Sequence, residues 1–204
     1  MTEADARAWI AGRFGEAACK QLERYAALLL EEGERQNLIA RSTMDSVWTR
    51  HFLDSAQLVP LGDAAGEGEW VDIGAGAGLP GVVASILQDR HVVMIEPRRR
   101  RVEFLDRVIQ TLSLDAEVLC TSAARCQRPP AAIVSARAVA SLDTLLRDGA
   151  GFSDLSTTWL LPKGRSAQSE LADARHAWHG VFHVEPSLTA ADSSIVVARQ
   201  VRRR

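Results

Sequence analysis

The sequence has few cysteines and no long apolar run, and these two shortages limit the kinds of protein that it can encode. No apolar stretch in the 204 residues approaches the roughly 20 residues that a membrane-spanning helix needs. Residues 1–13 carry acidic side chains instead of the basic and then apolar regions of a secretory leader. Cys19, Cys120 and Cys126 include no Cys-x-x-Cys pair, which fits reduced thiols better than a disulfide framework. We therefore expect a cytoplasmic protein that is neither secreted nor bound to a membrane.

An excess of basic charge is also absent, because the formal net charge is −2 at pH 7. This balance excludes a uniformly basic nucleic-acid binder. The arginines are nevertheless unevenly placed, with runs at residues 98–101 and 202–204, so an anionic partner is compatible with the low net charge. A hydrophobic fraction of 47% with 25% charged residues is typical of one globular domain with a short appendage.

The first third of the chain shows a helical pattern. Apolar side chains at helical spacing predict an amphipathic helix over residues 16–34. A second helix is predicted to start after Ser42 or Thr43, both good N-caps, and to end at Pro60. Residues 62–69, which are rich in Gly, Ala and acids, are predicted to form a linker. We expect residues 1–66 to form a helical extension packed on a domain of residues 67–204.

After residue 69 short apolar runs alternate with helical stretches. Seven strands are predicted, at residues 70–73, 91–95, 116–120, 131–135, 158–161, 181–184 and 195–199. The first five are far enough apart for crossover helices, which indicates a parallel sheet. The last two are close together and predict an antiparallel hairpin at one side of the sheet. This α/β pattern is that of a class I, Rossmann-like methyltransferase rather than a two-halved dinucleotide dehydrogenase.

A glycine-rich loop follows the first predicted strand, in the segment from Asp72 to Gly81. Glycines there permit a tight turn and let a ligand approach the backbone. The spacing fits two motifs, because Gly74-x-Gly76-x-Gly78 is typical of methyltransferases and Gly76-x-Gly78-x-x-Gly81 of dinucleotide-binding proteins. The strand ends at Ile73, so the methyltransferase register is favoured, although a purely structural turn is the alternative.

Two further positions support an adenosine ligand. Glu96 follows the second strand, 20 residues after Gly76, where a carboxylate can accept both ribose hydroxyls. An acid that faces the dipole of the following helix would stand at the same place, and the two roles are compatible. The turn Ser122-Ala123-Ala124 after the third strand lies where an adenine ring would sit, although it is also compatible with an ordinary turn.

With these residues the chain resembles the ribosomal RNA small subunit methyltransferase G family, also called glucose-inhibited division protein B. The resemblance extends from about Leu28 to the C-terminus and depends on five segments: Asn37-Leu38-Ile39-Ala40, Arg50-His51-Phe52-Leu53-Asp54-Ser55, the loop from Asp72 to Gly81, Ser135-Ala136-Arg137-Ala138 and Lys163-Gly164. It implies methyl transfer from S-adenosylmethionine to N7 of a guanine in the 530 loop of 16S ribosomal RNA. The partner is then 16S ribosomal RNA or the small ribosomal subunit, and we expect a monomer.

The predicted cofactor site combines the loop, the acid and the turns after the third and fourth strands: Gly74, Gly76, Gly78, Leu79, Glu96, Ala123, Ala124 and Arg137. The resemblance supplies Gly74, Leu79, Ala123, Ala124 and Arg137. Two positions depart from the family pattern, because Ala124 replaces an acid and Glu32 stands where many members have a tryptophan. A contact between the cofactor and the backbone of residue 124 does not need the acidic side chain, so it is compatible with alanine at this position.

Contacts with RNA are predicted at basic positions near strand ends and in the tail: Arg137, Lys163, Arg202, Arg203 and Arg204. Lys163 is one of two lysines in the chain, and a solvated loop lysine is the alternative interpretation. At least two of the arginines at residues 98–101 are expected on a solvated face, because residues at helical spacing cannot all point one way.

No catalytic side chain and no metal ion is expected. Guanine N7 carries a free electron pair, so methyl transfer needs in-line approach and no general base. His51 and Asp54, three residues apart, suggest acid–base chemistry, but a docking role against the sheet is favoured. His176, His179 and His183 lack the partners of a metal site. The alternative functions are a small-molecule methyltransferase and a nucleotide-binding regulator without chemistry.

Overall fold

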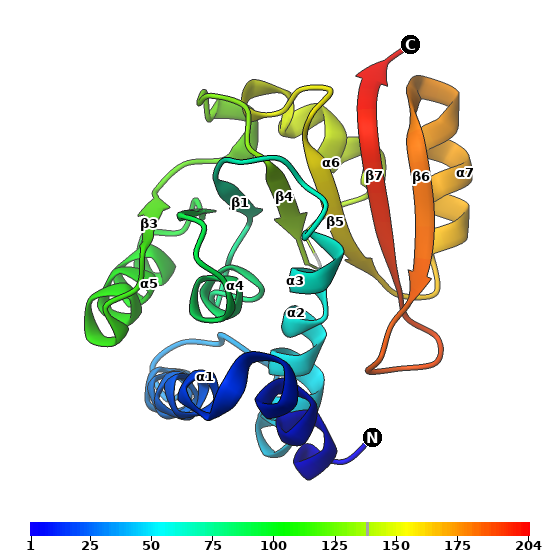
Figure 1. Ribbon diagram of the computed structural model, residues 1–204. Helices are drawn as coiled ribbons and strands as arrows, with labels where there is room; N and C mark the ends of the chain where they lie inside the picture. Colours follow the sequence, from blue (N-terminus) through cyan, green and yellow to red (C-terminus); the bar gives the residue numbers. More distant parts are fainter. Residues whose placement is uncertain (138) are drawn as a thin grey trace.

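A mixed β-sheet runs through the centre of the molecule and separates two layers of helices (Figure 1). The computed structural model describes residues 1–137 and 139–204, so Ala138 of the Ser135-to-Ala138 motif lies outside the described residues. Seven strands are described: β1 (Trp70–Ile73), β2 (Val92–Ile95), β3 (Ala116–Leu119), β4 (Ile133–Ala136), β5 (Thr158–Lys163), β6 (Trp178–Pro186) and β7 (Ser194–Arg203). Their order in the sheet is β3-β2-β1-β4-β5-β7-β6.

This topology confirms the predicted fold class. Strands β1 to β5 pair in parallel, and β7 pairs antiparallel with both β5 and β6, as predicted for the terminal hairpin. All seven strands lie where the apolar runs predicted them, within a few residues. Lys163 was expected just after the fifth strand but is its last residue, because β5 pairs with β7 as far as the Lys163–Ser194 position.

The helices are α1 (Glu3–Gly33), α2 (Asp54–Ala56), α3 (Leu58–Leu61), α4 (Gly81–Leu87), α5 (Arg99–Leu112), α6 (Leu142–Asp148) and α7 (Ala167–Ala177). Shorter helical turns are η1 (Arg41–Ser46), η2 (Trp48–Leu53), η3 (Ala123–Arg125) and η4 (Ala150–Phe152). Helices α1 to α5 share one apolar core on one face of the sheet, and α6 and α7 share a second core on the other face. No helix in the described part of the chain is long and apolar enough to cross a membrane.

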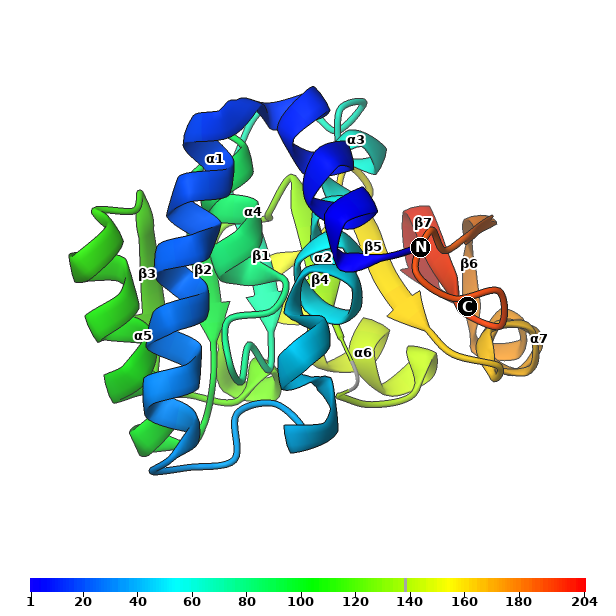
Figure 2. The ribbon, with the colours of Figure 1, turned by 90° about the horizontal axis from the view of Figure 1, so that it is seen from below.

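Helix α1 is longer than the sequence predicted. It begins at a capping box, in which Thr2 and Asp5 exchange side-chain and backbone hydrogen bonds. Gly15, with φ 85° and ψ 165°, breaks the helical geometry, and Figure 2 shows the resulting bend. The part after the bend is the predicted helix over residues 16–34, and the part before it was missed.

The second predicted helix begins earlier and ends later than expected. The chain enters helical turns at Arg41, so Ser42 and Thr43 lie inside η1 and are not N-caps. A π-helical turn, η2, follows, and α3 then continues through Pro60 to Leu61. Pro60 is tolerated because it lies in the first turn of a short helix, where a backbone N–H has no helical partner.

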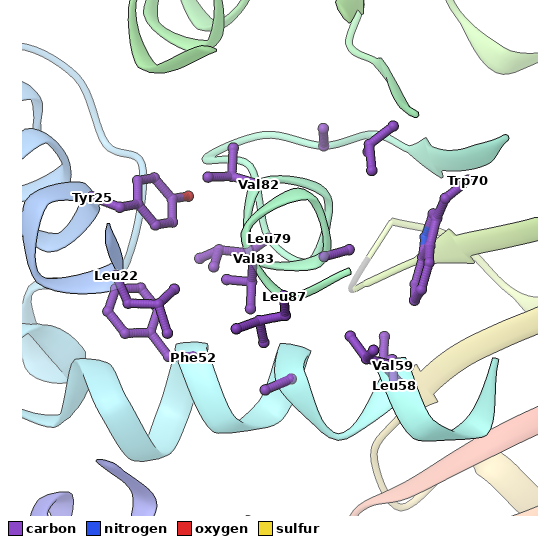
Figure 3. Packing of buried hydrophobic residues seen from close by; sticks show 14 of the residues in the cluster. Leu22, Tyr25, Phe52, Leu58, Val59, Trp70, Leu79, Val82, Val83 and Leu87 are labelled. Carbon is purple, nitrogen blue, oxygen red and sulfur yellow. The ribbon is translucent and has the colours of Figure 1, made fainter. Parts of the chain in front are cut away.

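The N-terminal helices pack directly on the sheet domain. Leu22, Tyr25 and Phe52 are fully buried against Val82 and Leu87 of α4 (Figure 3). Residues of the predicted extension and of the predicted domain therefore contribute to a single core. The division at residue 66 stays a prediction about sequence organisation.

Glu32, one of the two departures from the family pattern, connects α1 to α5. The residue is 7% exposed, and its carboxylate forms an ion pair with Arg107 at 2.5 Å. Gln36 also donates to this carboxylate at 2.8 Å. A buried charge that is paired and hydrogen-bonded in this way is tolerated at a helix–helix contact.

Candidate active site

The glycine loop leaves the carboxyl end of β1 with three left-handed residues. Gly74, Gly76 and Gly78 have φ values of 65°, 58° and 93°, which L side chains rarely adopt. The N–H groups of Gly74 and Ala75 both donate to the carbonyl of Ile95, so the turn is anchored to β2. The loop therefore needs glycine for its backbone conformation, as the sequence predicted.

A cleft of about 660 Å³ opens beside this loop at the carboxyl edge of the parallel strands. It is lined by the loop, the start of α5, the helical turns η1 and η2, and the loop between β6 and β7. Five of the predicted cofactor residues line it: Gly74, Gly76, Leu79, Glu96 and Arg137. The topology thus brings together residues from three different strand ends.

Three other predicted residues do not line this cleft. A Cβ at Gly78 would lie 2.5 Å from Val82 Cγ2 and 2.9 Å from the Tyr25 hydroxyl, so this glycine serves close packing. Ala123 is buried in the core beneath α6. Ala124 is exposed on η3, at the same edge of the sheet. The cofactor contact of Gly78 and the adenine contacts of Ala123 and Ala124 stay predictions.

Glu96 is buried at the base of the cleft, with 2% of its surface exposed. Its Oε2 accepts from the N–H of Gly76 at 2.9 Å, and its Oε1 accepts from the N–H of Arg98 at 2.9 Å. Arg98 is the N-cap residue of α5, so the carboxylate faces the positive end of that helix. Because a carboxylate oxygen has two acceptor sites, each oxygen can take one further hydrogen bond from a ligand.

Asp72, on β1, supports the loop from behind. It is fully buried; its Oδ2 accepts from the N–H of Gly81 at 3.0 Å and its Oδ1 from the Ser135 hydroxyl at 2.7 Å. Ser135 in turn accepts from the indole N–H of Trp70. Burial raises the pKa of Asp72 to about 7, although these hydrogen bonds oppose the shift.

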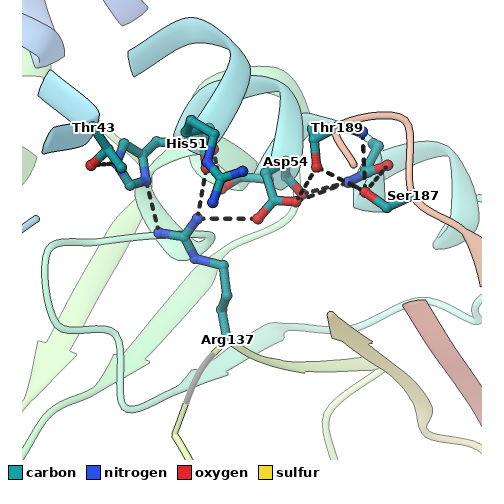
Figure 4. Close-up of polar contacts among 9 residues, drawn as sticks. Thr43, His51, Asp54, Arg137, Ser187 and Thr189 are labelled. Atoms are coloured by element: carbon teal, nitrogen blue, oxygen red, sulfur yellow. Dashed lines mark hydrogen bonds and ion pairs between the residues drawn. The ribbon is translucent and has the colours of Figure 1, made fainter. Parts of the chain in front are cut away.

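Arg137 follows β4 and contacts the helical segment from the opposite wall (Figure 4). Its guanidinium forms an ion pair with Asp54 at 3.1 Å and also donates to the backbone carbonyl of Arg50 at 3.2 Å. Its other terminal nitrogen lies 3.3 Å from Nδ1 of His51. The Arg-His-Phe-Leu-Asp-Ser segment therefore docks on the sheet through Arg137, as expected for His51 and Asp54, and the absence of an acid–base role for these two residues stays a prediction.

The neighbours of His51 define its tautomer. Thr43 donates its only hydroxyl hydrogen to the carbonyl of Ala40 at 2.7 Å, so the Thr43 oxygen accepts from Nε2–H of His51 at 2.8 Å. Nδ1 then accepts from Arg137. Burial, with the charge of Arg137 as the second cause, lowers the pKa of His51 to about 4. The imidazole is therefore neutral near pH 7.

The loop between β6 and β7 closes the cleft on a third side. The hydroxyl of Thr189 donates to Oδ1 of Asp54 at 3.0 Å, and the N–H of Leu188 donates to Gln57 at 2.8 Å. Sequence reasoning missed Thr43, Gln57 and Thr189. No local pattern could have found the last two, because their partners lie about 130 residues away along the chain.

Lys163 lies in an adjoining cleft of about 400 Å³ that also contacts Arg137. Its side chain is only 9% exposed and forms an ion pair with Glu170 at 2.8 Å. It also donates to the carbonyl of Ala140 at 2.6 Å. Because its charge is already neutralised within the protein, this geometry does not favour the predicted RNA contact at Lys163.

The C-terminal arginines lie at the wrong edge of the sheet for the predicted contact. β7 runs antiparallel to β5, with Ser194 opposite Lys163 and Ala198 opposite Trp159. The strand therefore starts at the edge of the cleft and carries Arg202, Arg203 and Arg204 to the opposite edge, where Figure 1 shows the C-terminus. The direction of one strand thus separates these arginines from Arg137.

Comparisons with known proteins agree with this architecture. The model of the family described as rRNA small subunit methyltransferase G matches residues 18–195. Two relatives with the name "Ribosomal RNA small subunit methyltransferase G" are similar over nearly the whole chain. The one from Rhizorhabdus wittichii is 46% identical over 100% of this chain and 95% of its own length. The one from Sphingopyxis alaskensis is 47% identical over 96% of this chain and 85% of its own length.

Solved structures share the fold at low sequence identity. A mutant of MtNAS in complex with S-adenosylmethionine has a TM-score of 0.60 and 18% identity, over 90% of this chain and 76% of that one. The ribosomal protein L11 methylase from Lactobacillus delbrueckii subsp. bulgaricus has a TM-score of 0.55 and 15% identity, over 74% of this chain and 78% of that one. The family match and the curated relatives show that this chain belongs to the rRNA small subunit methyltransferase G family.

Proposed function

We propose that this protein transfers a methyl group from S-adenosylmethionine to N7 of a guanine in the 530 loop of 16S ribosomal RNA. The observation that carries the proposal is the cleft at the carboxyl edge of the sheet, in a chain that belongs to this family. Relatives are named for action on small-subunit ribosomal RNA, and one structure of the same fold is described as an S-adenosylmethionine complex.

The residues in the cleft fit the cofactor. Left-handed glycines at positions 74 and 76 leave the loop backbone free of side chains, so a ligand can approach it closely. Glu96 provides a buried carboxylate that matches the ribose hydroxyls of an adenosine group. Arg137 provides a cation that can hold the carboxylate of the methionine part. When bound, S-adenosylmethionine would supply an electrophilic methyl group.

Positioning, not proton transfer, is the task left to the side chains. Guanine N7 is unprotonated at neutral pH and loses no proton on attack, so no general base is needed. The neutral His51 and the Asp54–Arg137 ion pair are engaged with one another and hold the walls of the cleft. We assign them a positioning role and name no catalytic acid or base.

The proposal is tested by mapping 7-methylguanosine in 16S ribosomal RNA with and without this protein. Purified protein and S-adenosylmethionine should methylate one guanine of the 530 loop, either in RNA or in small subunits from a strain that lacks the modification. Methylation of another base would reject the site assignment. Binding of NAD in preference to S-adenosylhomocysteine would instead favour a nucleotide-binding regulator, and methylation of small molecules alone would favour the other enzyme.

A further inference from the structure

We infer that Arg50 and Arg98 bind phosphates of the substrate RNA at the mouth of the cleft. This inference rests on the proposed function and names the surface through which the RNA is held. It replaces the sequence-based assignment of that role to the C-terminal arginines, which lie at the opposite edge of the sheet.

In the part of the chain that the structure describes, four arginines from three separate segments line the cleft, whereas only two carboxylates do, those of Asp54 and Glu96. The two carboxylates already have inner partners, because Arg137 pairs with Asp54 at 3.1 Å and Arg101 lies 3.8 Å from Glu96. Arg50 and Arg98 form no ion pair within the described residues, and both are exposed at the cleft. The cleft therefore presents to solvent two guanidinium groups that have no ion-pair partner among the described residues, one on η2 and one at the start of α5.

The arginines at the start of α5 are not explained by the stability of that helix. Arg98 is the N-cap and the next three arginines begin the helix, where its dipole favours negative charge. The first turn contains no acidic residue. A sequence that breaks a local rule in this way points to a functional requirement.

The four arginines of this run have different surroundings. Arg99 forms an ion pair with Glu103 one helical turn later, and neither Arg99 nor Arg100 lines the cleft. Arg101 faces Glu96 within the cleft. Among the described residues, Arg98 is thus the member of the run that lines the cleft without an ion-pair partner, and Arg99, the next residue, provides a matched control.

Guanidinium groups are well suited to RNA phosphates, because their planar donors can contact two phosphate oxygens at once. Arg50, on η2, and Arg98, at the start of α5, line the same cleft as Arg137, so a strand whose target base enters the cleft would carry its flanking phosphates past both of them. Each phosphate contact releases counterions and makes binding salt-dependent.

The test uses the full-length protein with the double variant Arg50→Gln and Arg98→Gln. Binding to unmodified 16S ribosomal RNA is measured over a salt series, together with the KM and kcat for methylation. Loss of two contacts should reduce the slope of log K against log salt by about 1.4 to 1.8 and raise the KM for RNA about tenfold or more. Calorimetry with S-adenosylmethionine should give the wild-type affinity. The substitutions leave in place the hydrogen bond from the backbone N–H of residue 98 to Glu96 and the one from Arg137 to the backbone carbonyl of residue 50.

The controls separate this inference from its rivals and from the proposed function. Arg99→Gln should keep the wild-type salt slope. The triple variant Arg202→Gln, Arg203→Gln and Arg204→Gln should also keep it. A wild-type slope in the double variant, or a reduced slope in the triple variant alone, would overturn the inference. Methylation of 16S ribosomal RNA by the wild-type protein would in that case still support the proposed function. If the wild-type protein fails to methylate 16S ribosomal RNA, the proposed function fails, whichever arginines set the salt slope.

Discussion

At the scale of single residues, the site depends on backbone shape and on buried polar groups more than on reactive side chains. The glycines of the loop give it a left-handed path, and the carboxylates Asp72 and Glu96 bind its N–H groups from inside the fold. His51 is held neutral by burial and by the charge of Arg137. These features produce a rigid cleft wall, which suits a reaction that depends on orientation.

Gly76→Ala should weaken S-adenosylmethionine binding at least tenfold and leave the fold intact. A Cβ at Gly76 would meet only the flexible guanidinium of Arg101 at 3.4 Å and the carbonyl of Gly74 at 3.6 Å. Its left-handed φ would cost about 1 kcal/mol, and its methyl group would face the ligand. Calorimetry measures the affinity, and Gly66→Ala, which meets nothing within 4 Å, is the control. Unchanged affinity in the folded Gly76 variant would reject the assigned loop.

Asp72→Asn should change how stability depends on pH. Because burial raises the pKa of Asp72 to about 7, the folded protein holds its proton at pH values where the unfolded chain loses it. The stabilisation is therefore complete below about pH 4 and disappears as pH rises to about 7, by at most about 4 kcal/mol. Urea unfolding from pH 4 to 8 measures this. The unfolding free energy of the wild type should fall relative to that of the variant over that range, and a constant difference would contradict the assignment.

The methylation step itself should not depend on proton transfer. With a pKa of about 4, His51 stays neutral between pH 7.5 and 8.5, and Asp72 has passed its own titration near pH 7. Single-turnover rates with saturating cofactor and RNA should then be nearly constant over this range. His51→Ala should weaken binding without removing the chemical step. A rate that follows one ionisation in this range, and loses that dependence in His51→Ala, would show that a base is used and would exclude N7 as the target atom.

At the scale of secondary-structure elements, the cleft is assembled by contacts between segments that are distant in sequence. The π-helical turn η2 and helix α2 present His51 and Asp54 on one side, and Gln57 follows directly after α2. Arg137 after β4 and the loop between β6 and β7 contact them from the sheet. The loop between β6 and β7 therefore depends on Asp54 and Gln57 for its position.

Gln57→Ala should release the loop between β6 and β7. The variant loses the hydrogen bond from Leu188 N–H at 2.8 Å and the contacts between its amide group and Ser187. Hydrogen exchange over residues 187–193 should become at least several-fold faster, with little change in the strands, because loops held by few contacts open locally. Gln88→Ala, at the end of α4, removes a glutamine with only local bonds and serves as the control. Unchanged exchange in the loop would show that other contacts hold it.

At the scale of the whole molecule, the helical N-terminal third and the sheet domain share one hydrophobic core. Ile10, Leu22, Tyr25, Leu29 and Phe52 are fully buried in the same cluster as residues of α4 and α5. The Tyr25 hydroxyl also donates to the carbonyl of Ala77 in the glycine loop. The extension is thus joined to the ligand-binding loop through both apolar and polar contacts.

Residues 67–204 alone should fail to fold into a stable domain. Burial of one large apolar side chain contributes about 1.5 to 3 kcal/mol, so removing five would cost about 7.5 to 15 kcal/mol, which is comparable to the usual 5 to 15 kcal/mol stability of a domain. Near-UV circular dichroism and thermal unfolding of the truncated chain, beside the full chain, measure this outcome. A cooperative transition near that of the full chain would show that the sheet domain is independent.

The sequence by itself determined the elements of this protein that depend on local chemistry. Apolar runs and their separation located all seven strands, and the glycine spacing located the turn after β1. These features are readable because strand formation and left-handed turns depend on residues close in the chain. The same local reasoning misplaced the start of the second helix and missed the first part of α1, where capping and tertiary contacts decide the boundaries.

Only the tertiary structure decided which charged side chains face the cleft. Lys163 turns inward to Glu170, and the direction of β7 carries the arginine tail to the far edge of the sheet. Within the run at residues 98–101, Arg99 is paired with Glu103 and Arg101 with Glu96. Arg98 has no such partner among the described residues. A linear sequence gives the sign of each charge, but its partner is set by strand direction and by segments that meet across the fold.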